Sequence, residues 1–241
     1  MIRVIGVGDN TVDVYVLSRT MYPGGNAVNV PVLAHRYGHP ASYLGWLGND
    51  VHGLLIWESL KKEGVDISHC RLIDGQNAYC EVFLKDGDRT FGSYSSGVCD
   101  QIQLSDEDYR FIREYDLVHT SVYSFIEPQL KTLRKFAATL SFDFSQEWDR
   151  RMLERIAPDI DIALLSYPSV NSHETEELLR RVVGLGSRLA IATRGEHGAL
   201  AFDGKRLYHQ PIFPTHVVDT LGAGDAFSAR FMVTYLSGSS V

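Results

Sequence analysis

The chain has 241 residues, of which 44% are hydrophobic and 22% are charged, and its formal net charge at pH 7 is −7. This length can bury a sizeable core, and it suits one α/β domain with an appendage better than two independent domains. The acidic balance argues against general nucleic-acid binding, which requires clustered lysine and arginine side chains.

The start of the chain and its cysteines bear on the cellular compartment. The apolar part of residues 1–8 is too short for a signal peptide, and no run approaches the roughly twenty apolar residues of a membrane span. Cys70, Cys80 and Cys99 show no C-x-x-C spacing, which favours reduced thiols over disulfides or a zinc site. We therefore expect a cytoplasmic protein that does not enter a membrane.

The first predicted strand covers residues 3–7 and is followed by two carboxylates. Asp9 and Asp13 come where parallel strands usually expose their ligand-binding ends. A carboxylate in that place can accept hydrogen bonds from sugar hydroxyls. A turn aspartate with a purely structural role is the other interpretation, and for Asp9 it has nearly equal weight.

Helices and strands then alternate along most of the chain. Helices are predicted up to residue 37, over 51–63 behind the cap Asp50, up to 115 and over 128–138. Strands are predicted over 42–47, 78–84, 90–94, 117–119, 141–144, 160–165 and 189–193. This alternation predicts a doubly wound, mostly parallel sheet flanked by helices. His119 and Asp143 fall at strand ends, but without a nucleophile-bearing turn they do not favour a His–Asp acid–base pair.

The most reactive stretch runs from Asp219 to Asp225, DTLGAGD. It is predicted to join a strand at Val217–Val218 to a helix over 226–236. Gly222 and Gly224 permit a positive φ and a close approach, so that consecutive N–H groups can converge on an anion at the helix start. Asp225 could then accept the proton of an attacking hydroxyl. A base beside an anion cradle suggests phosphoryl transfer, although an aspartate capping a glycine turn is also common for structural reasons.

This heptapeptide is similar to the D-T-x-G-A-G-D signature of the PfkB carbohydrate kinases, the ribokinase-like family. Further resemblances to family signatures lie at residues 24–30 (G-G-x-x-A-N-x-A), 47–53 (V-G-x-D-x-x-G), 171–174 (N-x-x-E) and 192–198 (V-T-x-G-x-x-G). Within the family, the chain looks most like the fructoselysine 6-kinases at residues 8–10, 92–98 and 142–148. The resemblance spans residues 5–235.

The resemblance implies ATP-dependent phosphorylation of a sugar or sugar-amine hydroxyl, with fructoselysine converted to fructoselysine 6-phosphate. Asp225 would be the base, and the transferred phosphate would lie on Gly222, Ala223 and Gly224. The implied sugar site is Asp9, Asp13, Gly24, Gly25, Asn26 and Asn29. The implied nucleotide site is Thr193, Gly195, Gly198, Gly222 and Gly224. Asn171 and Glu174 would order the waters around a phosphate-bound Mg²⁺.

The resemblance also implies a single ribokinase-like domain, residues 1–241, with a small β-sheet lid inserted at about 11–22 and 78–95. Because one apolar face of such a lid needs a cover, we expect a homodimer formed through it. Two features depart from the family. Arg230 stands where a glycine is usual, in a helix that we expect to be buried. Relatives also continue through C-terminal helices that close the adenine site, which leaves open a catalytically silent sugar-binding or regulatory protein.

Overall fold

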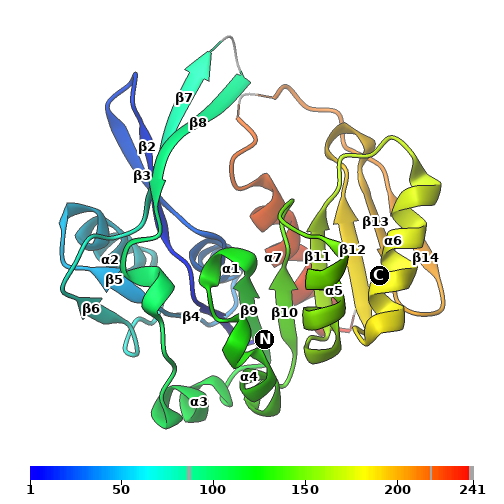
Figure 1. Ribbon diagram of the computed structural model, residues 1–241, viewed down its shortest axis with the longest axis horizontal. Helices are drawn as coiled ribbons and strands as arrows, with labels where there is room; N and C mark the ends of the chain where they lie inside the picture. The colour runs from blue at the N-terminus through cyan, green and yellow to red at the C-terminus, as the bar shows by residue number, and fades with distance from the viewer. Residues whose placement is uncertain (86–87, 218, 239–241) are drawn as a thin grey trace.

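The computed structural model describes residues 1–85, 88–217 and 219–238 (Figure 1). Its central feature is an eight-stranded sheet with the order β14-β13-β12-β11-β10-β9-β1-β4. The parallel strands are β1 (Val4–Val7), β4 (Ala41–Leu44), β9 (Leu117–Ser121), β10 (Leu140–Asp143), β11 (Ile162–Ser166) and β12 (Leu189–Thr193). An antiparallel edge follows, formed by β13 (Ala199–Phe202) and β14 (Leu207–Gln210). The predicted mostly parallel sheet is thus confirmed.

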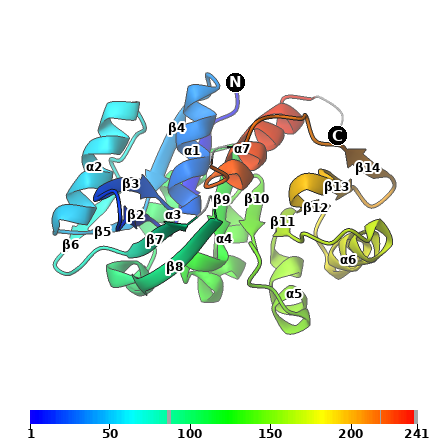
Figure 2. The same cartoon turned by 90° about the horizontal axis from the view of Figure 1, so that it is seen from above.

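Helices cover both faces of this sheet (Figure 2). On one face lie α1 (Asn26–Arg36) and α7 (Ala223–Leu236), and on the other α3 (Asp106–Ile112), α4 (Leu130–Phe136), α5 (Arg150–Ile156) and α6 (Ser172–Leu185). Successive strand residues point to opposite faces, so Val4 packs in the core under α1 while Ile5 packs in the core on the other side. Short 3₁₀ turns occupy Gly97–Gln101, Val122–Ser124, Glu127–Gln129, Ala157–Asp159 and Gly195–His197.

A second sheet, with the order β3-β2-β7-β8, projects from the first (Figure 1). It contains β2 (Thr11–Tyr15), β3 (Thr20–Gly24), β7 (Tyr79–Lys85) and β8 (Asp88–Ser95). These are the segments expected to form a lid. The hairpin turn expected at Asp86–Gly87 lies outside the described residues. Beside this sheet, α2 (Val51–Glu63) is capped by Asp50 as expected, and β5 (Trp46–Gly48) pairs with β6 (Arg71–Ile73).

The strand expected before the DTLGAGD motif is not formed at Val217, and Val218 lies outside the described residues. Residues 211–217 have no regular secondary structure, and Val217 is 65% exposed. A β-branched side chain favours a strand only where a neighbouring strand offers pairing and packing. Here the chain leaves the sheet after β14, so the motif follows an exposed connection.

The expectation that α7 is buried all round, Arg230 included, was also wrong. The guanidinium of Arg230 is exposed and lies 5.2 Å from the centre of the Tyr37 ring. The helix packs on the sheet through Ala229, Met232 and Val233. Its apolar composition reflects partial burial on several sides, which leaves room for one long cation at the surface.

The cysteines agree with the sequence-based expectation, whereas α3 ends three residues before the predicted 115 and α4 is shorter than the predicted 128–138. Cys70, Cys80 and Cys99 are free thiols, and burial raises the pKa of Cys70 and of Cys99 to about 12. Within the part of the chain that the structure describes, no helix combines the length and the apolar character needed to cross a membrane.

Candidate active site

The candidate site lies where the strand order changes direction, between the ends of β1 and β9. In open α/β sheets this is where ligands usually bind. Asp9, which follows β1, is buried, and its carboxylate accepts hydrogen bonds from the backbone N–H groups of Asn26 (2.6 Å) and Ala27 (3.2 Å). It also accepts from the hydroxyls of Ser121 (2.7 Å) and Ser124 (2.8 Å). With these partners Asp9 caps the start of α1. This contact corresponds to the structural role that the sequence analysis offered beside a sugar-binding one.

Two glycines let β3 run directly into α1. Gly25 has a φ of 105°, and a Cβ atom there would lie 2.6 Å from the Cα of Asn10. A Cβ atom at Gly24 would lie 2.8 Å from a carboxylate oxygen of Asp13. A larger residue is excluded at Gly25 by the backbone of Asn10 and the positive φ, and at Gly24 it would displace the Asp13 carboxylate from its place beside the start of α1.

Asp225 faces α1 from the first turn of α7. Its Oδ1 accepts a hydrogen bond from the side-chain amide of Asn26, and its Oδ2 accepts one from Asn29, each at 2.7 Å. Burial raises the pKa of Asp225 to about 7; the Asn29 amide opposes the rise, and the charge of Asp143 adds to it. A carboxylate with this pKa can take a proton from a hydroxyl near neutral pH.

Asp143, at the end of β10, is a site residue that the sequence analysis did not assign. Its Oδ2 accepts a hydrogen bond from the Asn26 amide at 2.9 Å, and its Oδ1 accepts one from the N–H of Ser145 at 2.7 Å. Burial raises the pKa of Asp143 to about 6. His119 also belongs to this cluster, since its Nε2 lies 2.5 Å from Oδ1 of Asn26. Both residues were predicted at strand ends, which is correct for Asp143 but wrong for His119, the middle residue of β9. Their common partner Asn26 was not visible in the sequence.

The start of α7 is open. Gly222 has a φ of 73°, and a Cβ atom on Gly222 or Gly224 would meet nothing within 4 Å. The N–H of Ala223 donates to the carbonyl of Thr220, whereas in the described residues the N–H groups of Gly224 and Asp225 have no acceptor. Free N–H groups at a helix start form a site for an anion such as phosphate.

The residues predicted to bind the nucleotide lie at the neighbouring strand ends. Thr193, at the end of β12, lines a small cavity together with Asp143 and Gly224. Gly195 has a φ of 58° with open space beside its Cα. Gly198 has a different requirement, because a Cβ atom there would lie 2.1 Å from the carbonyl oxygen of Gln210. Its glycine keeps the start of β13 close to β14.

Asn171 and Glu174 open α6 at the same end of the sheet. The Asn171 side chain accepts hydrogen bonds from the N–H groups of His173 (3.0 Å) and Glu174 (3.4 Å), so it caps the helix. The Glu174 carboxylate is exposed, 3.4 Å from the Ser169 hydroxyl. Among the described residues, no cluster of three or more His, Cys, Asp or Glu side chains could hold a metal ion. The exposed Glu174 carboxylate is a hard oxygen donor, which fits an ion that keeps its waters and binds chiefly to phosphates, as Mg²⁺ does, and Asn171 holds the start of the helix that carries it.

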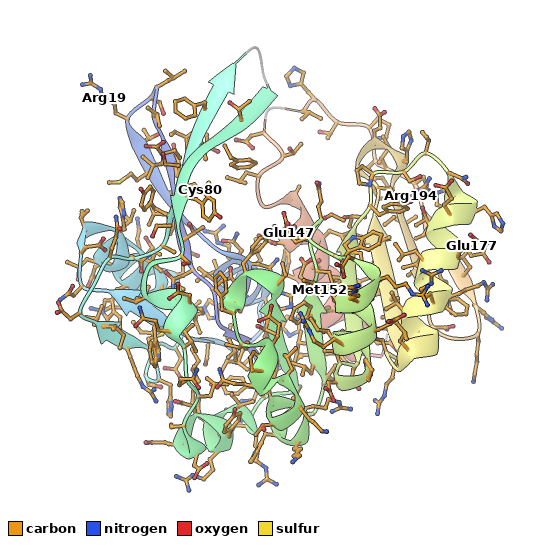
Figure 3. All side chains as sticks on the ribbon, in the orientation of Figure 1. Arg19, Cys80, Glu147, Met152, Glu177 and Arg194 are labelled. Carbon is orange, nitrogen blue, oxygen red and sulfur yellow. The ribbon has the colours of Figure 1, made fainter. Side chains whose placement is uncertain are left out.

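Arg194 fixes the loop before Asn171 (Figure 3). Its side chain is buried, and its guanidinium donates to the carbonyl oxygens of Ser169 and Val170, each at 3.0 Å. A buried cation that binds two carbonyls holds the loop in one position. No pattern in the sequence predicts this role, because the partners of Arg194 are backbone carbonyls, which every residue has.

Comparison with known proteins places this geometry in a family. The chain matches the pfkB family of carbohydrate kinases over residues 1–241. It is 37% identical over 236 residues to fructoselysine 6-kinase of Escherichia coli, covering 98% of this chain and 90% of the relative. It is 40% identical over 237 residues to fructosamine kinase FrlD of Bacillus subtilis, covering 97% and 83%.

Two solved structures have the same fold. Arabidopsis thaliana ribokinase, complexed with ribose and ATP, matches with a TM-score of 0.84 at 23% identity, covering 99% of this chain and 86% of that one. Ribokinase of Thermotoga maritima matches with a TM-score of 0.81 at 18% identity, covering 100% and 88%. The resemblance found in the sequence motifs is confirmed, and the chain belongs to the pfkB family of carbohydrate kinases, which are phosphotransferases.

Proposed function

We propose that this protein uses ATP to phosphorylate a fructosamine, converting fructoselysine to fructoselysine 6-phosphate. The observation that carries the proposal is the position of Asp225, which faces two asparagine amides of α1 from the open start of α7. The substrate class is supported by the relatives at 37% and 40% identity, which are a fructoselysine 6-kinase and a fructosamine kinase.

In the proposed reaction, Asp225 accepts the proton of the sugar hydroxyl as its oxygen attacks the γ-phosphorus of ATP. The new O–P bond forms while the bond from the γ-phosphorus to the bridging oxygen of ADP breaks, and ADP leaves with that electron pair. The N–H groups of Gly224 and Asp225 stabilise the charge on the transferred phosphoryl group, with Gly222 and Ala223 shaping the turn. Asp13, Gly24, Gly25 and Asn29 orient the sugar.

The nucleotide is proposed to lie along the strand ends, beside Thr193 and Gly195. Asn171 and Glu174 would hold Mg²⁺ through water, with most of its remaining ligands supplied by the phosphates. When bound, the ion neutralises charge on the phosphate oxygens. Omission of Mg²⁺ from the assay should abolish turnover, and full activity in the presence of a chelator would contradict this assignment.

A kinase assay tests the activity directly. ADP release is measured with fructoselysine, fructose and ribose, and the position of the new phosphate is read from phosphorus–proton coupling by NMR. We expect kcat/KM for fructoselysine to exceed that for the other sugars by about 10²-fold or more, since the relatives at 37% and 40% identity are a fructoselysine 6-kinase and a fructosamine kinase and a site that hydrogen-bonds a substrate amine rejects analogues without it. Folded protein that phosphorylates none of them would refute the kinase. The comparisons give no support to a catalytically silent sugar-binding protein.

We also propose that the protein works in the cytoplasm as a homodimer joined through the lid sheet. Phe91 and Tyr94 of β8, the edge strand of this sheet, are 64% and 80% exposed. An apolar patch of this kind usually has a partner. Sedimentation should give a dimer that Tyr94→Glu dissociates and that Leu72→Glu, on β6, leaves intact. If the wild-type protein sediments as a monomer at high concentration, the dimer proposal is wrong. If cell fractionation finds the protein in the membrane fraction, the cytoplasmic location is wrong.

A further inference from the structure

One side-chain amide, that of Asn26, joins two carboxylates of the site. Its Nδ2 donates to Oδ1 of Asp225 at 2.7 Å and to Oδ2 of Asp143 at 2.9 Å. An amide nitrogen has two hydrogens, so both are committed to carboxylates. The amide oxygen must then face the other way, where Nε2 of His119 lies 2.5 Å from it.

The proton positions on His119 follow from its partners. The side chain is fully buried, and burial lowers its pKa to about 3, so the imidazole is neutral. Because the oxygen of Asn26 can only accept, Nε2 carries the single ring proton. Nδ1 must therefore accept a hydrogen bond, and the hydroxyl of Ser141, 2.8 Å away, supplies it in preference to the carbonyl oxygen of Val118 at 3.2 Å. A chain of bonds thus runs in one direction from Ser141 through His119 to Asn26.

We propose that His119 is a positioning residue for the base: through the chain from Ser141 to Asn26 it holds both amide hydrogens of Asn26 on Asp143 and Asp225. The inference rests on the proposed function only in taking Asp225 as that base. The amide could otherwise turn over and place its oxygen against a carboxylate. His119 opposes this, because a turned amide would bring an N–H against the N–H of Nε2, and relieving that contact requires the imidazole to change tautomer and the Ser141 hydroxyl to turn to the carbonyl of Val118.

The electrostatic consequence has a definite sign. The titratable groups that face Asp225 are Asp143 of β10, Asp9 after β1 and His119 of β9, while α1 presents the neutral amides of Asn26 and Asn29. A hydrogen-bond donor to a carboxylate lowers its pKa. If Asn26 loses its orientation, the pKa of Asp225 rises further, and a larger share of the base is protonated at neutral pH.

The test compares three substitutions on one strand. His119→Leu removes the donor. His119→Gln can restore it, with its amide nitrogen toward Asn26 and its oxygen toward Ser141. Thr120→Val is the matched control, because Thr120 is the fully buried neighbour on β9 and its hydroxyl has no partner among the described residues. Carboxyl ¹³C NMR of the substrate-free protein follows Asp225, and the pH profile of kcat/KM for fructoselysine follows the base.

We expect His119→Leu to move the Asp225 midpoint upward by about half a unit to one unit, and the acid limb of kcat/KM with it. His119→Gln should restore the Asp225 midpoint and the acid limb of kcat/KM most of the way to their wild-type values. Thr120→Val should leave both at the wild-type values. Equal midpoints in wild type and His119→Leu, or equal shifts with Leu and Gln, would overturn the proposal. If the His119→Leu variant does not fold, Ser141→Ala should raise the Asp225 midpoint by a smaller amount. An unchanged midpoint in Ser141→Ala would then overturn the proposal. A shift of the NMR midpoint without kinase activity would uphold the positioning role and refute the proposed function.

Discussion

The starts of α1 and α7 are built alike but filled differently. Each helix follows a glycine in the left-handed region, Gly25 at a φ of 105° and Gly222 at 73°. At α1 the protein's own carboxylate, Asp9, binds the first N–H groups, and Asn10 leaves no room for a Cβ atom. At α7 a Cβ atom added to Gly222 or Gly224 would meet nothing within 4 Å, and the N–H groups of Gly224 and Asp225 have no acceptor among the described residues. The two glycines differ in ψ, 136° at Gly25 and 0° at Gly222. A helix start behind a positive-φ glycine thus forms a fixed joint where an internal carboxylate binds its N–H groups, and a binding site where they are left for an external anion.

The largest effect is expected from Asp225→Asn, at the open start. The substitution removes the base, so turnover should fall by about 10²- to 10⁴-fold. Stability should fall by only about 1 kcal/mol, because both carboxylate oxygens accept from amides and an asparagine can serve one of them. Steady-state kinetics and thermal unfolding measure the two effects.

Asp149→Asn is the matched control, since Asp149 caps α5 and asparagine caps equally well. It should keep full turnover. An Asp225→Asn enzyme with wild-type turnover would mean that Asp225 serves the helix start alone.

At the filled start, Gly25→Ala should act on stability rather than on chemistry. The methyl group would meet the backbone of Asn10, and the positive φ adds strain, for a cost of about 2–4 kcal/mol. Gly38→Ala, after the other end of α1, has a φ of 88° but open space, so only the strain of about 1 kcal/mol remains. Denaturant unfolding compares the two variants. Equal losses would show that the contact with Asn10 does not constrain the joint.

The sequence predicted those elements whose signals are local. The helix from Val51 to Glu63 and the strand from Leu189 to Thr193 have the predicted bounds, because a capping Asp50 and a continuous apolar run define them without reference to the rest of the chain. The expected strand at Val217 failed for the opposite reason, since a strand requires a partner that the sequence does not name. The antiparallel edge formed by β13 and β14 was missed for the same reason.

The site divides in the same way. Motif resemblance singled out Asp225, Asn26 and Asn29, and the fold brings their side chains within hydrogen-bonding distance. The contribution of Asp143 and His119 depends on Asn26, more than ninety residues earlier in the chain. Sequence spacing carries no information about such a contact.

The pH dependence sharpens the contrast between activity and stability. With a pKa of about 7, Asp225 must lose its proton to act as base, so kcat/KM should fall about tenfold per pH unit below that value. Stability should change in the opposite direction. The folded protein holds the proton of Asp225 more tightly than the unfolded chain does. The contribution of this proton to the free energy of unfolding is therefore complete below about pH 4 and is lost as the pH rises through 7. In Asp225→Asn this part of the stability change should be absent; if it persists unchanged, another group titrates.

The smallest effect, and the one that separates the two helix starts most cleanly, is expected from Gly224→Ala. Gly224 lies inside the first turn of α7 without a positive φ, and a Cβ atom there meets nothing, so alanine should stabilise the helix by about 0.5–1 kcal/mol. The same methyl group would occupy the space before the free N–H groups, so turnover should fall by roughly tenfold. Gly184→Ala, in α6 and equally open, is the control that should gain stability and keep its activity. If Gly224→Ala gains stability and also keeps full activity, no phosphate is bound at the start of α7, and the empty space there has no role in catalysis.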